Sequence, residues 1–169
     1  GSGAPLLARE APDRSGGNAR RLWQAACPLV GTPAEDHLAQ RGIRHHSDQL
    51  RFLARTPLGP REQVQFLPAM LAAVCTDVGI VAVHRTFFDP TKRKLASFER
   101  PRRALGSLGI GAVRLALAVD GHLGLAEGIE TALSVPMLFG IPCWATLGNE
   151  RFGLVSIPES VRELHLFLD

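Results

Sequence analysis

The sequence contains no tyrosine, three cysteines and two tryptophans, and aromatic residues make up 6% of its 169 positions. Without tyrosine, the chain cannot support a reaction that needs a tyrosine nucleophile. With so few aromatic side chains, base stacking is a minor part of any contact with nucleic acid. Cys27, Cys75 and Cys143 form no Cys-x-x-Cys pair, so we expect three buried thiols and no zinc site in this chain. Unpaired thiols favour a reducing, cytoplasmic location.

Long apolar runs are also missing. No stretch approaches the roughly 18 residues that a membrane-spanning helix needs, so we expect no membrane partner. Residues 1–17 start with Gly-Ser-Gly, which is typical of an expression remnant, and continue without periodicity. We therefore expect a disordered tail there. The remaining residues are apolar enough to bury a core, at 46% of the whole chain.

One apolar run ends on an acid. Leu123–Ala126 is followed directly by Glu127, then by Gly128 and a helical pattern. This order predicts a buried strand that delivers Glu127 to its carboxyl end, with Gly128 permitting a tight turn into a helix. Alternatively, Glu127 only caps that helix, where an acid favours the helix dipole. The spacing predicts that four side chains of the helix face the sheet: Thr131, Ala132, Val135 and Leu138.

The same pattern recurs twice downstream. Residues 142–147 are apolar and end at Gly148, and residues 164–168 end at Asp169. Parallel strands joined by right-handed crossovers bring such carboxyl ends to one edge of a sheet. Carboxylates that meet there provide the oxygen ligands that Mg²⁺ prefers. The sequence therefore predicts an Mg²⁺ or Mn²⁺ site that includes Glu127 and Asp169.

This C-terminal segment resembles the toprim domain of bacterial primases, topoisomerases and some nucleases. Glu127, Gly128 and residues 130–134 are similar to its glutamate motif, and Asp169 is similar to the first aspartate of its Asp-x-Asp motif. The chain ends there, so residues 120–169 are expected to be a C-terminally truncated toprim domain. The resemblance implies that Glu127 is a metal ligand or proton-transfer residue and that Asp169 is a metal ligand, with Gly128 and Gly148 near the site.

The chain from about Arg20 to Val119 is similar to the region that precedes toprim in phage- and plasmid-type primases. Residues 18–119 are expected to form one domain, a helical hairpin followed by a basic antiparallel β subdomain. Helical spacing over Arg20–Cys27, and a Thr-Pro helix start at Thr32 that ends near Gly42, predict a helical hairpin. Alternating apolar residues then predict a small antiparallel sheet. Its expected strands are residues 50–53, 69–76, 80–88, 94–98 and 112–119. A glycine-containing turn at residues 77–79 should join the second and third strands as a hairpin, and Asp120-Gly121 should form a hairpin-type turn after the last strand. The expected fold class is α/β with an α+β N-terminal part, in which helices and this small sheet lead into a parallel sheet flanked by helices.

Positive charge gathers in the middle of the chain. Eight of the 19 Lys and Arg residues lie between positions 85 and 114, against two acids. Such a cluster fits a phosphate-rich partner, although a flexible basic loop is the alternative. The candidate contacts to template or triphosphate are Arg85, Lys94, Arg102, Arg103 and Arg114.

The resemblance implies metal-dependent nucleotidyl transfer, with primer synthesis on single-stranded DNA from nucleoside triphosphates, in the replication of a phage, plasmid or other mobile element. It also implies a helicase or a zinc-binding module outside this chain. A toprim nuclease and a non-catalytic nucleic-acid-binding module remain as alternatives. A self-contained topoisomerase is excluded because the chain has no tyrosine.

Overall fold

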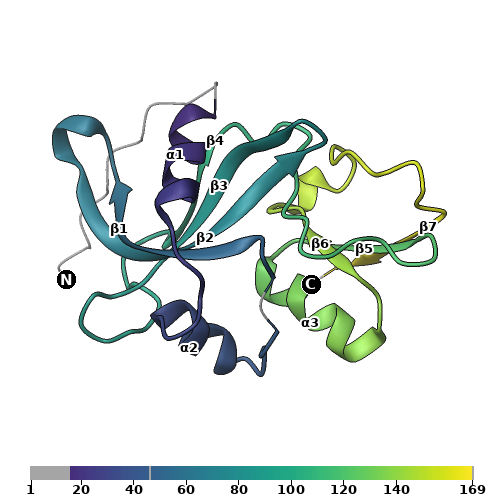
Figure 1. The fold of residues 1–169 in the computed structure, drawn as a ribbon, viewed down its shortest axis with the longest axis horizontal. Helices are drawn as coiled ribbons and strands as arrows, with labels where there is room; N and C mark the ends of the chain where they lie inside the picture. Colours follow the sequence, from purple (N-terminus) through teal and green to yellow (C-terminus); the bar gives the residue numbers. More distant parts are fainter. Residues whose placement is uncertain (1–15, 46, 169) are drawn as a thin grey trace.

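In the computed structural model, residues 16–45 and 47–168 form a four-stranded antiparallel sheet and a three-stranded parallel sheet, with helices packed against both (Figure 1). The strand orders are β1-β2-β3-β4 and β6-β5-β7. The elements are α1 (Gly17–Ala25), α2 (Pro33–Ala39), β1 (Leu50–Leu58), η1 (Arg61–Gln63), β2 (Gln65–Thr76), β3 (Gly79–Phe87), β4 (Arg102–Gly106), β5 (His122–Ala126), α3 (Ile129–Phe139), β6 (Cys143–Ala145), η2 (Asn149–Arg151) and β7 (Glu163–Phe167). No helix among these residues has the length and apolarity to cross a membrane.

The two N-terminal helices are confirmed with shifted boundaries. Gly16 precedes the first residue of α1, which begins three residues before the predicted Arg20. Thr32 and Pro33 occupy the first positions of α2 as predicted, but the Thr32 hydroxyl donates to the carbonyl of Leu29 rather than capping the helix. The expectation of three buried thiols is confirmed for Cys143 alone, because Cys75 is half-buried and Cys27, which follows α1, is exposed. Cys27 lies on the segment between the helices, where its apolar sequence neighbours do not cover it.

The hairpin of β2 and β3 is confirmed and forms the centre of the antiparallel sheet. Residues Ala69–Val74 are buried without interruption because both faces of β2 are covered. Successive residues of β2 point to opposite faces of the sheet: one face packs against α1, and the other packs on the side where α2 lies. A bulge shifts the pairing register between Val74 and Cys75. As a result, Val81 packs on the α2 side of the sheet, whereas Val83 packs on the α1 side.

The strand expected at residues 94–98 is instead found at β4. Leu95 makes only an isolated bridge with Phe88, while residues 102–106 pair along β3. The carboxylate of Asp89 accepts hydrogen bonds from the backbone of Thr91 and Lys92, which forms a turn and delays the return of the chain. The next strand therefore begins several residues later than alternation alone suggests.

The expected strand at residues 112–119 is a connection between the two sheets. Ala112 pairs with Cys75 of β2, and Val113 pairs with Ala145 of β6, each as an isolated bridge. The predicted turn at Asp120-Gly121 is confirmed: both residues have positive φ, and the flanking residues exchange two backbone hydrogen bonds. This turn leads directly into β5.

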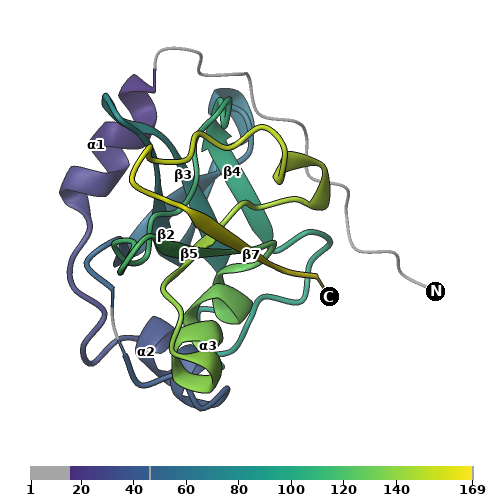
Figure 2. The same cartoon turned by 90° about the vertical axis from the view of Figure 1, so that its right-hand side faces the viewer.

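The three parallel strands occur where the sequence predicts them, with β5 at the centre. Helix α3 follows β5 and lies beside α2 (Figures 1 and 2). Its buried residues are Ile129, Ala132, Leu133 and Val135; Thr131 is half-buried and Leu138 is exposed. Two of the four expected sheet-facing residues are therefore buried, because α3 also packs towards the antiparallel sheet.

One hydrophobic core joins the two sheets. It contains Leu38 of α2, Met70 of β2, Ala126 of β5 and Leu133 of α3. A second core lies beneath α1, and a third covers the outer face of the parallel sheet around Trp144. This shared core contains residues from both sides of the expected domain boundary at position 119. It therefore holds the carboxyl end of β5 against the antiparallel sheet.

Candidate functional site

Glu127 lies at the carboxyl end of β5, as the sequence predicts. In the structure, β5 is the central strand of the parallel sheet. Its backbone carbonyl accepts a hydrogen bond from Leu147 (2.8 Å), which fixes the strand end beside the end of β6. Within the described part of the chain, the half-buried Glu127 carboxylate makes no hydrogen bond or ion pair. The fold therefore positions the Glu127 carboxylate without giving it a cationic or hydrogen-bonding partner among the described residues.

A cleft of about 410 Å³ opens beside this carboxylate. The parallel sheet and the start of α3 form one wall, and β3 and β4 contribute the other. The cleft therefore joins an acidic strand end to the basic antiparallel sheet. Its lining residues are His84, Arg102, Glu127, Gly128, Ile129, Glu130, Thr131 and Leu147.

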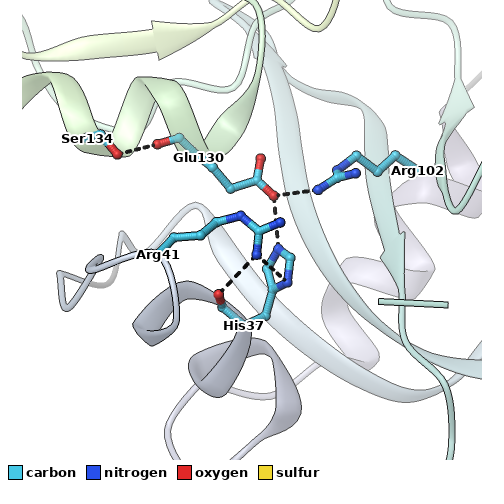
Figure 3. A network of polar contacts seen from close by, with 5 residues as sticks. All are labelled: His37, Arg41, Arg102, Glu130 and Ser134. Carbon is cyan, nitrogen blue, oxygen red and sulfur yellow. Dashed lines mark hydrogen bonds and ion pairs between the residues drawn. The ribbon is translucent and has the colours of Figure 1, made fainter. Parts of the chain in front are cut away.

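Glu130 is the centre of a polar network in this cleft (Figure 3). His37 donates to its Oε1 from Nε2 at 3.0 Å, and Arg102 donates to the same oxygen from Nη2 at 3.0 Å. Arg41 contacts the other ring nitrogen of His37 (3.2 Å), so an Nε2–H tautomer satisfies both contacts of the imidazole. The network connects α2, α3 and β4.

The environment of Glu130 holds its carboxylate ionised. Burial raises the pKa of Glu130, but the hydrogen bond from His37 and the charge and hydrogen bond of Arg102 outweigh burial and hold that pKa well below its usual range. The two glutamates of the cleft thus differ in their surroundings: Glu130 contacts His37 and Arg102, whereas Glu127 has no such partner among residues 16–45 and 47–168.

His84 lies on β3 and lines the same cleft. Burial lowers its pKa to about 4; the charge of Glu130 opposes this shift, and the charges of Arg102 and Arg85 add to it. The ring is therefore neutral at pH 7, and its buried Nδ1 has no hydrogen-bond partner among residues 16–45 and 47–168. Sequence reasoning missed the roles of His37, His84 and Glu130, because each depends on contacts between distant segments.

A second cleft, of about 390 Å³, adjoins the first and is strongly cationic. It shares His84, Arg102 and Leu147 with the Glu127 cleft and adds three further arginines, Arg85, Arg100 and Arg103. The guanidinium of Arg103 donates to the carbonyls of Arg100 and Glu99 (both 2.9 Å), which holds the loop before β4. Of the predicted phosphate contacts, Arg102 lines the Glu127 cleft, and Arg85 and Arg103 line the adjoining one.

Arg85 has a different environment from the one expected of a phosphate contact. Its side chain is 1% exposed. It donates to the carbonyls of Pro57 on β1 and of Arg103 and Ala104 on β4, at 2.9–3.3 Å. Because β1 and β4 are the two edges of the sheet, these bonds hold a curled sheet together.

Lys94 and Arg114 lie away from the Glu127 cleft. Lys94 is exposed on a loop beside α2, in a separate hollow with Lys92 and Arg93. Arg114 pairs with Asp77 (3.0 Å), and its guanidinium lies 4.7 Å from the ring centroid of Trp144. The predicted basic cluster is therefore divided among several places in the fold.

The two predicted glycines lie at the expected turns, but neither has a left-handed backbone. Gly128 has φ −99° and precedes the first residue of α3, and Gly148 has φ 168° and precedes η2. Extended conformations of this kind are open to other residues. The tight turn expected to require Gly128 is made without a positive φ.

Asp169 lies outside the described residues. The strand that leads to it, β7, runs parallel to β5 and pairs with it from His122 to Ala126. The strand neighbours required by the predicted metal site are thus present in the fold.

Comparisons with known proteins identify the family but not an activity. No curated protein and no solved structure matches the chain. A family model described as a domain of unknown function (DUF7146) matches residues 13–115, which is more than half of the chain. The matched region contains α1, α2 and the antiparallel sheet with its arginines, and it ends before β5. The chain therefore belongs to the DUF7146 family.

Proposed function

We propose that this chain is the core of a toprim-containing primase that performs metal-dependent nucleotidyl transfer on single-stranded DNA. The observation that carries the proposal is the uncommitted carboxylate of Glu127 beside a cationic cleft. Glu127 ends the central strand of a parallel sheet, a usual place for sites in such sheets. Arg102 connects the acidic and cationic clefts.

The donor set fits a hard divalent cation. Mg²⁺ is commonly held by one or two carboxylates together with substrate phosphates, so the free Glu127 carboxylate fits one such ligand. The toprim resemblance adds Asp169 as a second ligand. A bound Mg²⁺ or Mn²⁺ would stabilise negative charge on the attacking and leaving oxygens of the transferred phosphoryl group.

The chain's own residues would bind and orient the phosphates. Arg100, Arg102 and Arg103 line the cationic cleft and offer planar guanidinium groups that match phosphate oxygens. Glu130 holds Arg102 at the boundary of the two clefts, which makes Glu130 a positioning residue. His84 lines both clefts, and its neutral ring adds no charge to either of them.

Two other functions use the same features. A nuclease would use the Glu127 carboxylate to cleave the template, and a non-catalytic module would use only the arginines to bind it. The adjoining cationic cleft, lined by Arg100, Arg102 and Arg103, is the observation that supports the binding module.

The test is nucleotide incorporation on single-stranded DNA with Mg²⁺ or Mn²⁺. It should use the full-length protein that carries this sequence, beside its Glu127→Gln variant and an exposed control, Glu159→Gln. We expect metal-dependent extension that is lost in Glu127→Gln and retained in Glu159→Gln. Cleaved template without extension would support the nuclease, and salt-sensitive binding without turnover would support the binding module.

A further inference from the structure

Three potential metal ligands converge at the end of the parallel sheet opposite to Glu127. His122 begins β5, Glu163 begins β7, and these two residues pair in register. His165 follows two positions after Glu163, so it lies on the same face of β7. About 16 Å of extended chain separates His122 from Glu127, so this cluster is distinct from the candidate active site.

The ligand atoms of the cluster are close enough to share one ion. His122 Nδ1 lies 3.0 Å from His165 Nε2, and Glu163 Oε2 lies 3.3 Å from the first nitrogen and 3.7 Å from the second. Metal–ligand bonds of about 2.0–2.1 Å place neighbouring ligands of a tetrahedral zinc ion about 3.3–3.4 Å apart. The three observed separations, 3.0, 3.3 and 3.7 Å, are close to this ligand–ligand distance.

The three ligand atoms lie within contact distance of one another. The two imidazole nitrogens are within hydrogen-bond distance, and the carboxylate oxygen of Glu163 lies near both of them. One cation at the centre would contact all three atoms at once.

The cluster also leaves room for a further ligand. The side chains of His122, Glu163 and His165 are 41%, 63% and 32% exposed. Two histidines, one carboxylate and an open position resemble the ligand set of a three-ligand zinc site. Imidazole ligands favour zinc and similar transition metals over Mg²⁺, which prefers oxygen.

We propose that His122, Glu163 and His165 bind a divalent transition-metal ion of the zinc class. The ion would connect β7, an edge strand of the sheet, to the central strand β5. This proposal does not depend on the proposed function. It differs from the sequence-based expectation of no zinc site, because that expectation rested on cysteine spacing alone. Ligands on two strands about forty positions apart leave no local spacing signal.

The test is a Zn²⁺ titration of tag-free protein, followed by calorimetry and by the thermal unfolding midpoint. We expect one bound ion per chain and a raised midpoint. Because even the loss of an outer-shell partner weakens metal binding about tenfold or more, His122→Ala and His165→Ala should each bind Zn²⁺ at least that much more weakly. Glu163→Gln keeps the shape of the side chain and tests the carboxylate if an alanine variant fails to fold.

Two controls remove potential ligands elsewhere. His45→Ala and Cys27→Ser change exposed residues outside the cluster and should leave zinc binding unchanged. Co²⁺ should give the visible absorption of a tetrahedral complex in the wild type and lose it in His165→Ala. Zinc binding that is equal in the wild type and in His165→Ala, or that disappears in His45→Ala, would overturn the proposal, as would an unchanged unfolding midpoint.

Discussion

The carboxylate of Glu130 on α3 lies 3.0 Å from Nε2 of His37 on α2, across 93 positions of sequence. This contact, together with the ion pair to Arg102 on β4, joins the N-terminal helices, the antiparallel sheet and the parallel sheet at one point. Glu127, three residues earlier, has no such partner among the described residues. The two glutamates therefore differ in how the rest of the fold contacts them.

Glu130→Gln should destabilise the fold, whereas Glu127→Gln should not. Loss of the Glu130 charge leaves Arg102 unpaired and weakens the contact with His37, at a cost of about 1–3 kcal/mol in the free energy of unfolding. Glu127→Gln should change that free energy by less than about 0.5 kcal/mol. Urea unfolding of the two matched variants measures both values. Equal destabilisation would mean that Glu127 also has a structural role.

Arg85→Met should act on stability rather than on nucleic-acid binding. The substitution leaves the carbonyls of Pro57, Arg103 and Ala104 without their donor inside the sheet, which should cost about 2–4 kcal/mol. Thermal unfolding measures the loss. Single-stranded DNA binding, measured well below the unfolding midpoint, should keep its salt dependence. A selective loss of binding with normal stability would assign Arg85 to the interface.

Joint substitution of Arg102 and Arg103 with glutamine should weaken binding to single-stranded DNA. Each phosphate contact contributes about 0.7 to the slope of log K against log salt, so the slope should decrease by about 1.4. Fluorescence anisotropy at several salt concentrations gives this slope. The matched control is Arg44→Gln with Arg162→Gln, which removes equal charge from exposed positions outside the cationic cleft. An equal decrease in the control would show that only net charge matters.

His84 should make the fold less stable in mild acid. Its pKa is lowered to about 4 in the folded chain, against about 6.5 in the unfolded chain, so the unfolded state binds the proton first as pH falls. Stability should therefore be retained above pH 6.5 and decrease between pH 6.5 and 4, by on the order of 3 kcal/mol in total.

The control for this prediction is His84→Gln, which cannot titrate. Its free energy of unfolding should vary less with pH than that of the wild type in the same interval. Glu130 acts in a different window, because its lowered pKa favours the folded state above about pH 4.3 and that contribution is lost below it. Parallel pH curves for the wild type and His84→Gln would contradict the assignment.

Local patterns in the sequence were sufficient for most of the elements. An apolar run that stops at Glu127 marks the end of β5, and the Asp120-Gly121 pair marks the turn before it. The hairpin of β2 and β3 follows from two apolar runs around a glycine turn. Side-chain periodicity and turn preferences act over a few residues, so they can be recognised without a structure.

Local patterns were less successful where a distant partner decides the outcome. The strand expected at residues 94–98 lies instead at Arg102–Gly106, where the backbone also accepts hydrogen bonds from the buried Arg85. Arg85, Lys94 and Arg114 share a basic stretch of sequence with Arg102, yet only Arg102 lines the Glu127 cleft. Charge counting along the chain does not show which side chains a sheet buries.

The sequence alone determined that a carboxylate stands at the end of a buried strand, because hydrophobic periodicity and chain order are local properties. The central place of that strand in the sheet came from the tertiary structure. The tertiary structure decided which carboxylate remains available. His37 and Arg102 come from separate elements and converge on Glu130, while Glu127 keeps no partner in the described chain. The environment of each acid depends on contacts between segments far apart in sequence, and only the folded core brings those segments together.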